Sequence, residues 1–385
     1  MKGLVLDGVW DPRPGVALSE SEKQTRKVMN GNTAWRYPAL RVENVNDPKI
    51  CPDEVLVKVC AVGICGSDLS MVETDKDGYM LYPGLTRLPS VLGHECSGEV
   101  IEVGRNVTGL MVHERVAVED MIKCGHCAPC RMGWPNQCRN LDEIGFSTHG
   151  AIAEYLAIKA ENCWSIHALV ERYGGDFEKA CEAGATVELT AVVYNGLFEI
   201  AGGFRPGAFA AVYGAGPIGL SALALLKSAG AACVMVFEPS RQRQTLARAL
   251  GADFVFDPTE VIPHEAVLDV TKGIGADVHV EAAGAPTQTF PEIEQCLAIG
   301  ARVIMIGKSA KRTSVFLETF QDKRAQIFAA NGNSGYGTYL NVIRLMAAGA
   351  FDPTVMVTRR YTLDTAIAAI ENLKAREEGK ILIKP

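Results

Sequence analysis

The sequence lacks an excess of positive charge. Its 385 residues include 38 Lys and Arg against 45 Asp and Glu, which gives a formal net charge of -7. Nucleic-acid-binding domains usually have a basic footprint, and peripheral membrane proteins often have a basic amphipathic helix. The acidic balance therefore argues against both classes, and we expect neither nucleic acid nor a membrane as a partner.

The sequence also lacks internal repeats, low-complexity segments and a secretory leader. Twelve cysteines without a leader indicate a reducing compartment, so we expect a cytoplasmic protein. One stretch, 207–226, has no charged residue over twenty positions, which is long enough for a membrane span. Three glycines and a proline between 214 and 219 interrupt it, so a strand, a glycine turn and a helix explain it better.

The pattern of apolar residues predicts two domains. Short strands and glycine turns over 1–189 predict an antiparallel, mostly-β domain, to which we also assign the tail, 333–385. Strands alternate with helices over 190–332, which predicts a doubly wound parallel sheet, the Rossmann arrangement. The fold class is therefore α/β. We expect the parallel strands at 208–213, 232–237, 253–256, 277–281, 302–306 and 326–329, and helices at 241–250 and 287–297.

Four cysteines form a short C-x2-C-x2-C-x7-C pattern at Cys124, Cys127, Cys130 and Cys138. The loop between them is rich in Gly and Pro, which allows sharp turns. Four thiolates on one loop suit a closed tetrahedral Zn²⁺ site, and such a site has no open position for a substrate. We therefore expect a structural zinc here, with disulfide bonds as the alternative.

A glycine-rich motif predicts a dinucleotide-binding turn. The residues 214–219 have the pattern G-x-G-x-x-G between an apolar strand and a helix. We expect Gly214 to permit the tight turn, Gly216 to let the backbone approach the pyrophosphate, and Gly219 to let helix and strand pack closely. Pro217 and Ile218 open the helix, whose free N–H groups would face the phosphates.

Glu238 ends the next expected strand, nineteen residues after Gly219. A carboxylate at this place accepts hydrogen bonds from the adenosine ribose, and it repels the 2'-phosphate of NADP by about 4 kcal/mol at 4 Å and an effective dielectric of 20. Arg241 and Arg243 follow and could offset this repulsion. We favour NAD, with NADP as the alternative.

A second cluster of metal-ligand residue types precedes the four cysteines. Cys65 lies in the sequence G-I-C-G-S-D, and His94 begins the pattern H-E-x2-G-x5-G-x2-V, which Gly93 precedes. With the four-cysteine loop and the nucleotide motif in the same order, the chain resembles the zinc-dependent medium-chain alcohol and polyol dehydrogenases. The resemblance covers nearly the whole chain and implies a GroES-like catalytic domain beside the Rossmann domain.

The resemblance implies roles for the matching residues. Cys65, His94 and Glu95 would bind a catalytic zinc, and Glu188 occupies the position of the family's fourth ligand. Asp68 would hydrogen-bond to His94, Ser67 would take the proton of the substrate hydroxyl, and Gly284 would lie on the cofactor side. A catalytic and a structural zinc would then be bound per chain. The catalytic zinc acts as a Lewis acid, while the dinucleotide accepts the hydride.

The chain departs from the family pattern at two positions. Many relatives have a histidine three residues after the relay serine, where this sequence has Ser70. Either Ser70 with water or another group, such as His149, would complete the relay, although we favour the interpretation of His149 as a turn residue before Gly150. Leu189 also replaces the proline that commonly follows the ligand glutamate, which weakens the assignment of Glu188.

Two segments narrow the expected substrate. An insertion begins at Val9, and an unusual segment covers 77–84; both resemble the inosose dehydrogenases, the cyclitol subgroup typified by scyllo-inosose 3-dehydrogenase. This implies a cyclitol, aminocyclitol or related polyol, whose hydroxyls need several hydrogen-bonding partners. The candidate contacts by residue type and segment are Tyr79, Tyr82, Asn331, Asn333, Ser334 and Tyr336.

The sequence therefore predicts an NAD-dependent zinc dehydrogenase that acts on a secondary alcohol of a cyclitol or polyol. A threonine 3-dehydrogenase or a sorbitol-type dehydrogenase is the alternative within enzymes. An NAD-binding sensor on a retired dehydrogenase fold is the alternative of another class. The family resemblance also implies a homodimer or homotetramer.

Overall fold

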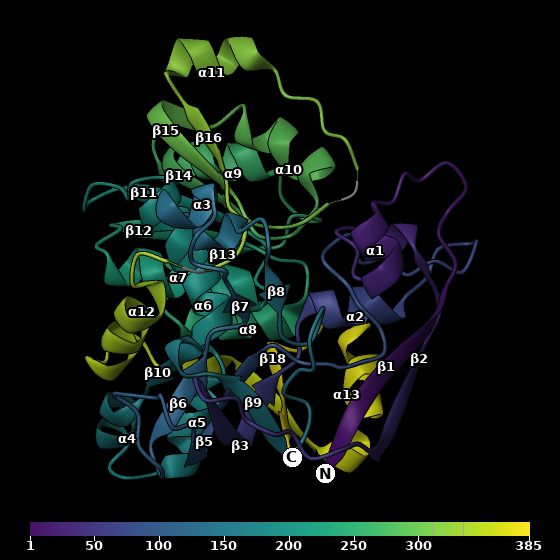
Figure 1. Ribbon diagram of the computed structural model, residues 1–385. Helices are drawn as coiled ribbons and strands as arrows, with labels where there is room; N and C mark the ends of the chain where they lie inside the picture. The colour runs from purple at the N-terminus through teal and green to yellow at the C-terminus, as the bar shows by residue number, and fades with distance from the viewer. Residues whose placement is uncertain (310, 334) are drawn as a thin grey trace. The chain divides into compact units, whose positions relative to one another are not determined.

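The structure is a computed structural model, and it describes residues 1–309, 311–333 and 335–385 (Figure 1). The contacts between residues divide the chain into two compact units, and both chain ends belong to the first. The first unit comprises Met1–Glu188, Arg359–Ala375 and Ile381–Pro385, and the second comprises Leu189–Thr358 and Arg376–Lys380. The predicted α/β class, with a mostly-β part and a parallel-sheet part, is confirmed.

Antiparallel sheets form the framework of the first unit. The larger has the strand order β10-β6-β5-β3-β18-β17, with β9 paired to β3, and the smaller has the order β2-β1-β4. A β7-β8 pair stands apart. The strands are β1 Lys2–Trp10, β2 Trp35–Asn44, β3 Glu54–Gly63, β4 Ser90–Val91, β5 Glu95–Val103, β6 Arg115–Val118, β7 Met121–Ile122, β8 Asp142–Glu143, β9 Tyr155–Lys159, β10 Cys163–Ser165, β17 Val357–Thr362 and β18 Lys380–Lys384.

The core of this unit lies between the sheets and the helices α2 and α13. Fully buried Leu4, Val57, Ile152 and Ile381 belong to it, and each such side chain contributes about 1.5–3 kcal/mol of burial free energy. The helices are α1 Glu20–Thr25, α2 Gly66–Val72, α3 Ala128–Arg131, α4 His167–Arg172, α5 Phe177–Gly184 and α13 Ala366–Leu373, and α6 Val187–Tyr194 leads into the second unit.

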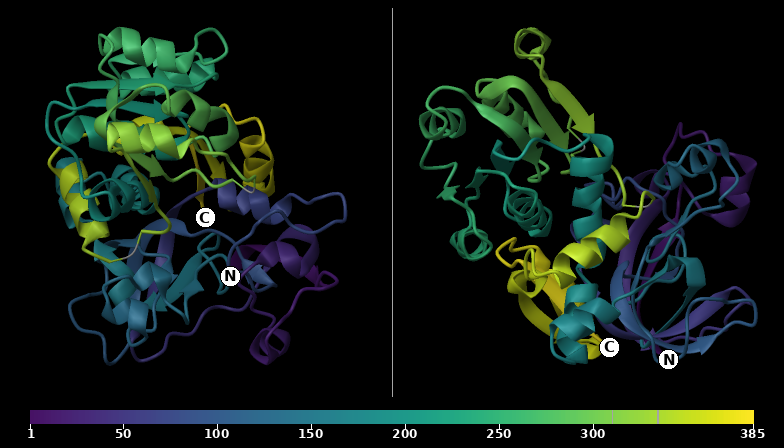
Figure 2. Two further views of the ribbon diagram at one scale, coloured as in Figure 1. Left: turned by 90° about the horizontal axis from the view of Figure 1, so that it is seen from above. Right: turned by 90° about the vertical axis from the view of Figure 1, so that its left-hand side faces the viewer.

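A six-stranded parallel sheet of order β13-β12-β11-β14-β15-β16 forms the second unit. The sheet is labelled in Figure 1, and Figure 2 shows helices on both of its faces, which explains why the central strands β11 and β12 are apolar along their whole length. The strands are β11 Phe209–Tyr213, β12 Cys233–Phe237, β13 Phe254–Phe256, β14 Ala276–Glu281, β15 Leu297–Met305 and β16 Gln326–Ala329. The helices are α7 Pro217–Ser228, α8 Arg241–Ala249, α9 Pro263–Val270, α10 Pro286–Ile293, α11 Leu317–Lys323 and α12 Thr338–Ala347.

The charge-free stretch folds as a strand, a turn and a helix, as the sequence predicts. It is divided between β11 and α7. In the described part of the chain, no helix has both the length and the hydropathy that a membrane span requires.

Two sequence expectations differ from the structure. The helix expected over 287–297 ends at Ile293, because Leu297 already pairs with Ala276 and opens β15. The tail assigned to the first domain, 333–385, divides between the units. Its part up to Thr358 belongs to the second unit, since Asn341 of α12 hydrogen-bonds to Tyr194 and the short 3-10 helix η5, Pro353–Met356, packs on α7 and α8.

A histidine is buried in the core of the second unit. His279 is 0% exposed, its Nε2–H donates to the carbonyl oxygen of Ala276 at 3.1 Å, and its Nδ1 lies 3.3 Å from the Tyr213 hydroxyl. Burial lowers the pKa of His279 to about 4. The unfolded chain therefore binds a proton at this residue between about pH 6.5 and pH 4, where the folded chain does not.

We expect His279→Gln to flatten the acid limb of the stability profile. Because the folded pKa is depressed, His279 destabilises the fold as pH falls below about 6.5. The cost reaches about 2 kcal/mol at pH 5. Urea unfolding at pH 7 and pH 5 measures this difference for wild type and variant. The exposed His167→Gln is the control. An unchanged pH dependence in His279→Gln would contradict the assignment.

Candidate metal centre and nucleotide-binding turn

Helix α2 positions the first candidate metal ligand. Cys65 immediately precedes this helix, and its backbone N–H donates to Asp68 Oδ2 at 2.9 Å. The other oxygen of the same carboxylate, Oδ1, lies 3.5 Å from His94 Nδ1, and Asp68 is 0% exposed. One buried carboxylate therefore faces both the Cys65 backbone and the His94 ring, as the carboxylates behind metal-binding histidines do.

The pairing of β3 with β5 brings the other candidate ligands to Cys65. Gly63, near the end of β3, lies opposite Glu95, the first residue of β5. The ligand atoms of Cys65, His94 and Glu95 all lie within 4.8 Å of one another. A Cβ at Gly63 would collide with the Glu95 carboxylate, so glycine here leaves room for that carboxylate in its present position.

The electrostatics of this group suit a divalent cation. Burial acts to lower the pKa of His94, but the charge of Asp68 and the neighbouring Cys65 raise it well above its usual range. Burial raises the pKa of Glu188, and the charges of Asp120 and Glu95 add to the effect. Thiolate, imidazole and carboxylate are the ligand types of zinc, and a cation would balance their surplus of negative charge. The residues present therefore fit the ion that the sequence predicts.

Glu188 lies close to the group without being one of its members. It belongs to α6, is 7% exposed, and its pKa responds to Glu95, His94 and Cys65. Among the described residues, however, only the other three have ligand atoms within 4.8 Å of one another at this place. Its role as a fourth ligand stays a prediction.

The residues considered for the proton path have different surroundings. Ser67 Oγ lies 3.4 Å from His94 Nε2, so the predicted relay hydroxyl is beside the candidate centre. Ser70 Oγ donates instead to the carbonyl oxygen of Gly66 within α2. His149 Nδ1 accepts the backbone N–H of Val91, and burial lowers the pKa of this histidine. The contact with Val91 gives His149 a structural role in fixing β4.

Phe146 is an aromatic residue beside the centre that the sequence patterns do not predict. The ring of Phe146 lies 4.6 Å from that of His94, and the ring of Tyr82 stacks on Phe146 at 4.9 Å with 13° between the planes. Phe146 is far from His94 in sequence and follows a glycine in an irregular loop. No motif distinguishes it, so only the tertiary structure identifies it.

The four cysteines of the short loop lie together. All four ligand atoms are within 4.8 Å of one another, and Cys127 Sγ is 3.5 Å from Cys130 Sγ and 3.8 Å from Cys138 Sγ. Tetrahedral zinc with Zn–S bonds of about 2.3 Å separates its sulfurs by about 3.8 Å, so the spacing fits that ion. None of the twelve cysteines is in a disulfide.

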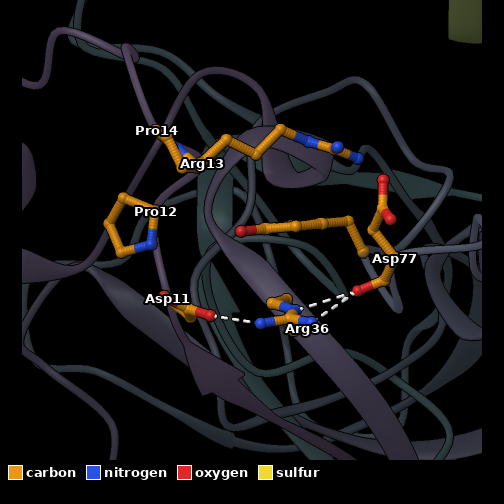
Figure 3. A pocket seen from close by; sticks show the side chains of 7 residues that line it. Asp11, Pro12, Arg13, Pro14, Arg36 and Asp77 are labelled. Carbon is orange, nitrogen blue, oxygen red and sulfur yellow. Dashed lines mark hydrogen bonds and ion pairs between the residues drawn. The ribbon is translucent and has the colours of Figure 1, made fainter.

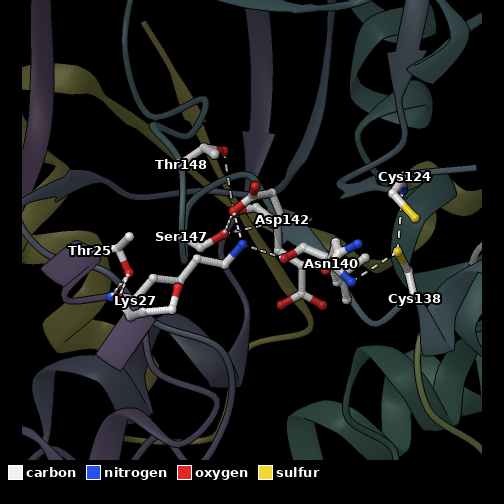
Figure 4. A network of polar contacts seen from close by, with 11 residues as sticks. Thr25, Lys27, Cys124, Cys138, Asn140, Asp142, Ser147 and Thr148 are labelled. Atoms are coloured by element: carbon white, nitrogen blue, oxygen red, sulfur yellow. Dashed lines mark hydrogen bonds and ion pairs between the residues drawn. The ribbon is translucent and has the colours of Figure 1, made fainter. Parts of the chain in front are cut away.

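Backbone N–H groups also point at these sulfurs. Those of Cys124 and Asn140 donate to Cys138 Sγ at 3.3 and 3.4 Å (Figure 4). A hydrogen bond from the backbone of His126 lowers the pKa of Cys124 to about 6, whereas burial raises that of Cys130 to about 12. Such N–H donors favour thiolates, which are the form that binds a metal.

The second unit contains the nucleotide-binding turn. Gly214 follows β11 with a φ of +96°, and Gly216 precedes Pro217 at the start of α7. A Cβ at Gly219 would collide with the carbonyl oxygen of Gly214, whereas one at Gly216 would meet only Arg243 Nη1, 3.7 Å away. Gly219 is thus required by packing, and Gly216 keeps the approach to the backbone open, as the sequence predicts.

Glu238 braces this turn. Its carboxylate accepts the N–H of Ala215 at 2.7 Å and that of Ser240 at 2.9 Å, and the residue is 4% exposed. Arg243 Nε donates to the carbonyl oxygen of Glu378 at 2.9 Å. The negatively charged Glu238 and the positively charged Arg243 therefore both border the glycine turn.

The remaining predicted residue of this motif, Ile218, is half-buried in the first turn of α7.

Gly284 lies at the end of β14 in the same unit. It has a φ of +65°, and its N–H and that of Ala285 donate to the buried Glu281 carboxylate at 3.3 and 3.1 Å. Because the carboxyl ends of neighbouring parallel strands share one edge, this turn and the glycine turn after β11 are at the same edge of the sheet.

The predicted substrate contacts divide into several groups. Tyr82 lies next to Phe146, whereas the ring of Tyr79 packs against the guanidinium carbons of Arg13 and Arg36 at 3.8 and 4.9 Å. Tyr79 lines a pocket of about 500 Å³ with 11–14, Arg36 and Asp77 (Figure 3). The remaining candidates lie after β16: Asn333 is buried, Asn331 and Tyr336 are exposed, and Ser334 lies outside the described residues.

Comparisons with known proteins identify relatives of the whole chain. The model of the alcohol dehydrogenase GroES-like domain matches residues 51–168, and that of the zinc-binding dehydrogenase domain matches residues 217–348. The chain is 42% identical to scyllo-inosose 3-dehydrogenase of Thermotoga maritima, an alignment that covers 100% of this chain and 98% of the relative. It is 32% identical to L-threonine 3-dehydrogenase of Pyrococcus furiosus, with coverages of 91% and 96%.

Solved structures of alcohol and zinc-binding dehydrogenases resemble the chain along nearly all of its length. A candidate alcohol dehydrogenase from Thermotoga maritima has a TM-score of 0.95 and 40% identity, with complete coverage of both chains. A zinc-binding dehydrogenase from Sinorhizobium meliloti bound to NADP has a TM-score of 0.78 at 27% identity, covering 93% and 99%. An E. coli alcohol dehydrogenase complexed with NADH has a TM-score of 0.79 at 25% identity, covering 100% and 99%.

Proposed function

The chain belongs to the zinc-binding medium-chain dehydrogenases, and on this premise we propose that it is an NAD-dependent oxidoreductase acting on a secondary alcohol of a cyclitol, aminocyclitol or related polyol. The main support is the convergence of Cys65, His94 and Glu95 within 4.8 Å in the first unit. Similarity to scyllo-inosose 3-dehydrogenase along the full chain favours a ring substrate over a simple alcohol.

In this proposal the residues of the chain hold and deprotonate the substrate. A Zn²⁺ ion bound by Cys65, His94 and Glu95 would supply a Lewis acid that lowers the pKa of an alcohol, and NAD⁺ would supply the hydride acceptor. Asp68 keeps the Nδ1 side of His94 engaged, so that Nε2 faces the centre. Ser67, whose hydroxyl lies 3.4 Å from Nε2, would contact the alcohol, receive its proton and pass its own hydroxyl proton on to water.

The proposal also covers the structural zinc, the oligomeric state and the cellular compartment. We infer a second, structural zinc at Cys124, Cys127, Cys130 and Cys138. We also infer a homodimer or homotetramer, as the family resemblance implies. The presence of twelve free cysteines favours a reducing compartment such as the cytoplasm.

A second candidate function has its own support. The full-length similarity to L-threonine 3-dehydrogenase makes an amino-alcohol substrate the alternative. Both candidates share the zinc centre and the nucleotide turn, so they differ only in the groups that surround the reacting carbon.

An NADH-absorbance screen tests the proposed function. The purified protein with two zinc ions per chain is offered NAD⁺ with myo-inositol, an aminocyclitol, sorbitol and L-threonine. We expect the highest kcat/KM for a ring polyol. A preference for threonine would establish the alternative, and NAD binding without turnover of any alcohol would indicate a sensor and refute the proposal.

Glu238 provides a test of the cofactor preference. We expect Glu238→Gln to raise the NADP⁺/NAD⁺ ratio of kcat/KM by at least about tenfold, because it removes a charge that repels a 2'-phosphate by about 4 kcal/mol. Glutamine keeps an acceptor for the backbone N–H of Ala215. The exposed Glu265→Gln of α9 is the control. A wild type that uses NADP⁺ as well as NAD⁺ would contradict the preference.

A further inference from the structure

The Tyr82 hydroxyl makes no hydrogen bond to the described part of the chain. The residue is only 5% exposed, but its hydroxyl oxygen is not among the fully enclosed polar atoms without a partner. The hydroxyl is therefore the accessible end of a largely buried side chain, and a polar group from outside the protein can pair with it. A Cβ at Gly84 would lie 2.5 Å from this oxygen, so the glycine leaves room for the hydroxyl.

The ring of Tyr82 is linked to the candidate metal centre through one intervening ring, that of Phe146. It stacks on Phe146, which in turn packs against His94, and each ring-to-ring step is under 5 Å. Burial raises the pKa of Tyr82 well above its ordinary value, and the charges of Glu143 and Cys65 add to the effect. The hydroxyl therefore stays protonated at neutral pH and can both donate and accept.

The N-terminal insertion holds this tyrosine in place. We name residues 11–34 the strap. Val28 of the strap and Thr86 form two backbone hydrogen bonds with each other. The N–H of Asn32 donates to the carbonyl oxygen of Tyr82 at 2.9 Å. A Cβ at Gly31 of the strap would collide with Thr86, so the two segments approach as closely as backbones allow.

Other contacts fix the strap and the tyrosine segment. Lys27 of the strap forms an ion pair with Asp142 at 2.7 Å and donates to the carbonyl oxygen of Leu141, next to the four-cysteine loop (Figure 4). The N–H of Leu81 donates to the carbonyl oxygens of Ser70 and Glu73, around the end of α2. Tyr82 is thus held by backbone bonds on both sides, which preorganises its hydroxyl.

We propose that the Tyr82 hydroxyl is a specificity-determining contact, which hydrogen-bonds to a ring hydroxyl of a polyhydroxylated substrate held at the Cys65, His94 and Glu95 centre. The inference rests on the proposed function and deepens it. The two segments that set this chain apart, the strap and 77–84, together position the contact. A site with a fixed hydroxyl that the protein leaves unpaired favours substrates that hydrogen-bond to it over analogues that cannot.

The test compares Tyr82→Phe with wild type on two ring alcohols. Myo-inositol has hydroxyls on every carbon, and trans-1,2-cyclohexanediol lacks those away from the reacting pair. We expect kcat/KM for myo-inositol to fall by about 10–100-fold and that for the diol to change less than about threefold, since one hydrogen bond to a neutral group is lost. Phenylalanine keeps the stack on Phe146, so metal content and Tm should not change.

Tyr155→Phe is the matched control. Tyr155 belongs to β9, is half-buried, and is not one of the candidate substrate contacts. We expect it to leave kcat/KM for both substrates unchanged. Equal losses on both alcohols in Tyr82→Phe, or no loss on myo-inositol, would overturn this inference alone. A wild type that oxidises no alcohol in the screen would overturn the proposed function and this inference with it.

Discussion

His94→Gln is expected to lower kcat/KM for the alcohol by about 1000-fold or more. The His94 ring faces Asp68 on one side and Ser67 on the other. Removal of an imidazole ligand deprives the substrate of a Lewis acid worth several kcal/mol, and each 1.36 kcal/mol is a factor of ten in rate. NADH production by the purified variant measures the loss.

Metal content shows whether this loss has the expected cause. The variant should retain one zinc ion per chain where the wild type has two, while its affinity for NADH, measured by fluorescence, stays within about twofold. His113→Gln is the matched control, because that side chain is 81% exposed and pairs with Glu99, not with a residue of the candidate centre. A His94→Gln protein that kept a tenth of the wild-type rate would rule out a zinc-dependent reaction at this place.

Cys138→Ser is expected to remove the other zinc ion and to open the four-cysteine loop. Cys138 is the most buried of the four, and its sulfur accepts two backbone N–H groups, those of Cys124 and Asn140. Structural zinc contributes about 10 kcal/mol of folding free energy in zinc-finger peptides. Trypsin should then cut at the exposed Arg131 and Arg139 at least about tenfold faster than in the wild type.

The same experiment separates zinc from disulfide bonds. A chelator should reproduce the effect of Cys138→Ser in the wild type, whereas a reducing agent should have none. Cys51→Ser removes an exposed cysteine outside the loop and serves as the control. Stability of the loop to trypsin in a zinc-free preparation, or its loss in reductant alone, would show that zinc does not hold the loop.

How much of a site the sequence predicts depends on how far apart its residues lie along the chain. The four cysteines lie within fifteen residues, so their spacing alone brings the sulfurs together, and the glycine motif likewise fixes its turn locally. The chain order of strands and helices in the second unit was predictable for the same reason, since each element has its own apolar period. The end of α10 was not, because the pairing of Leu297 with Ala276 overrides the local helical pattern.

The sequence by itself determined the residue types of the metal centre, the glycine turn and the alternation of elements, because these depend on neighbours along the chain. Only the tertiary structure decided which distant groups meet. The antiparallel register that places Gly63 opposite Glu95 brings Cys65 to His94, and the strap brings Tyr82 onto Phe146. Such contacts follow from strand pairing and packing between segments far apart in sequence, which no local pattern specifies.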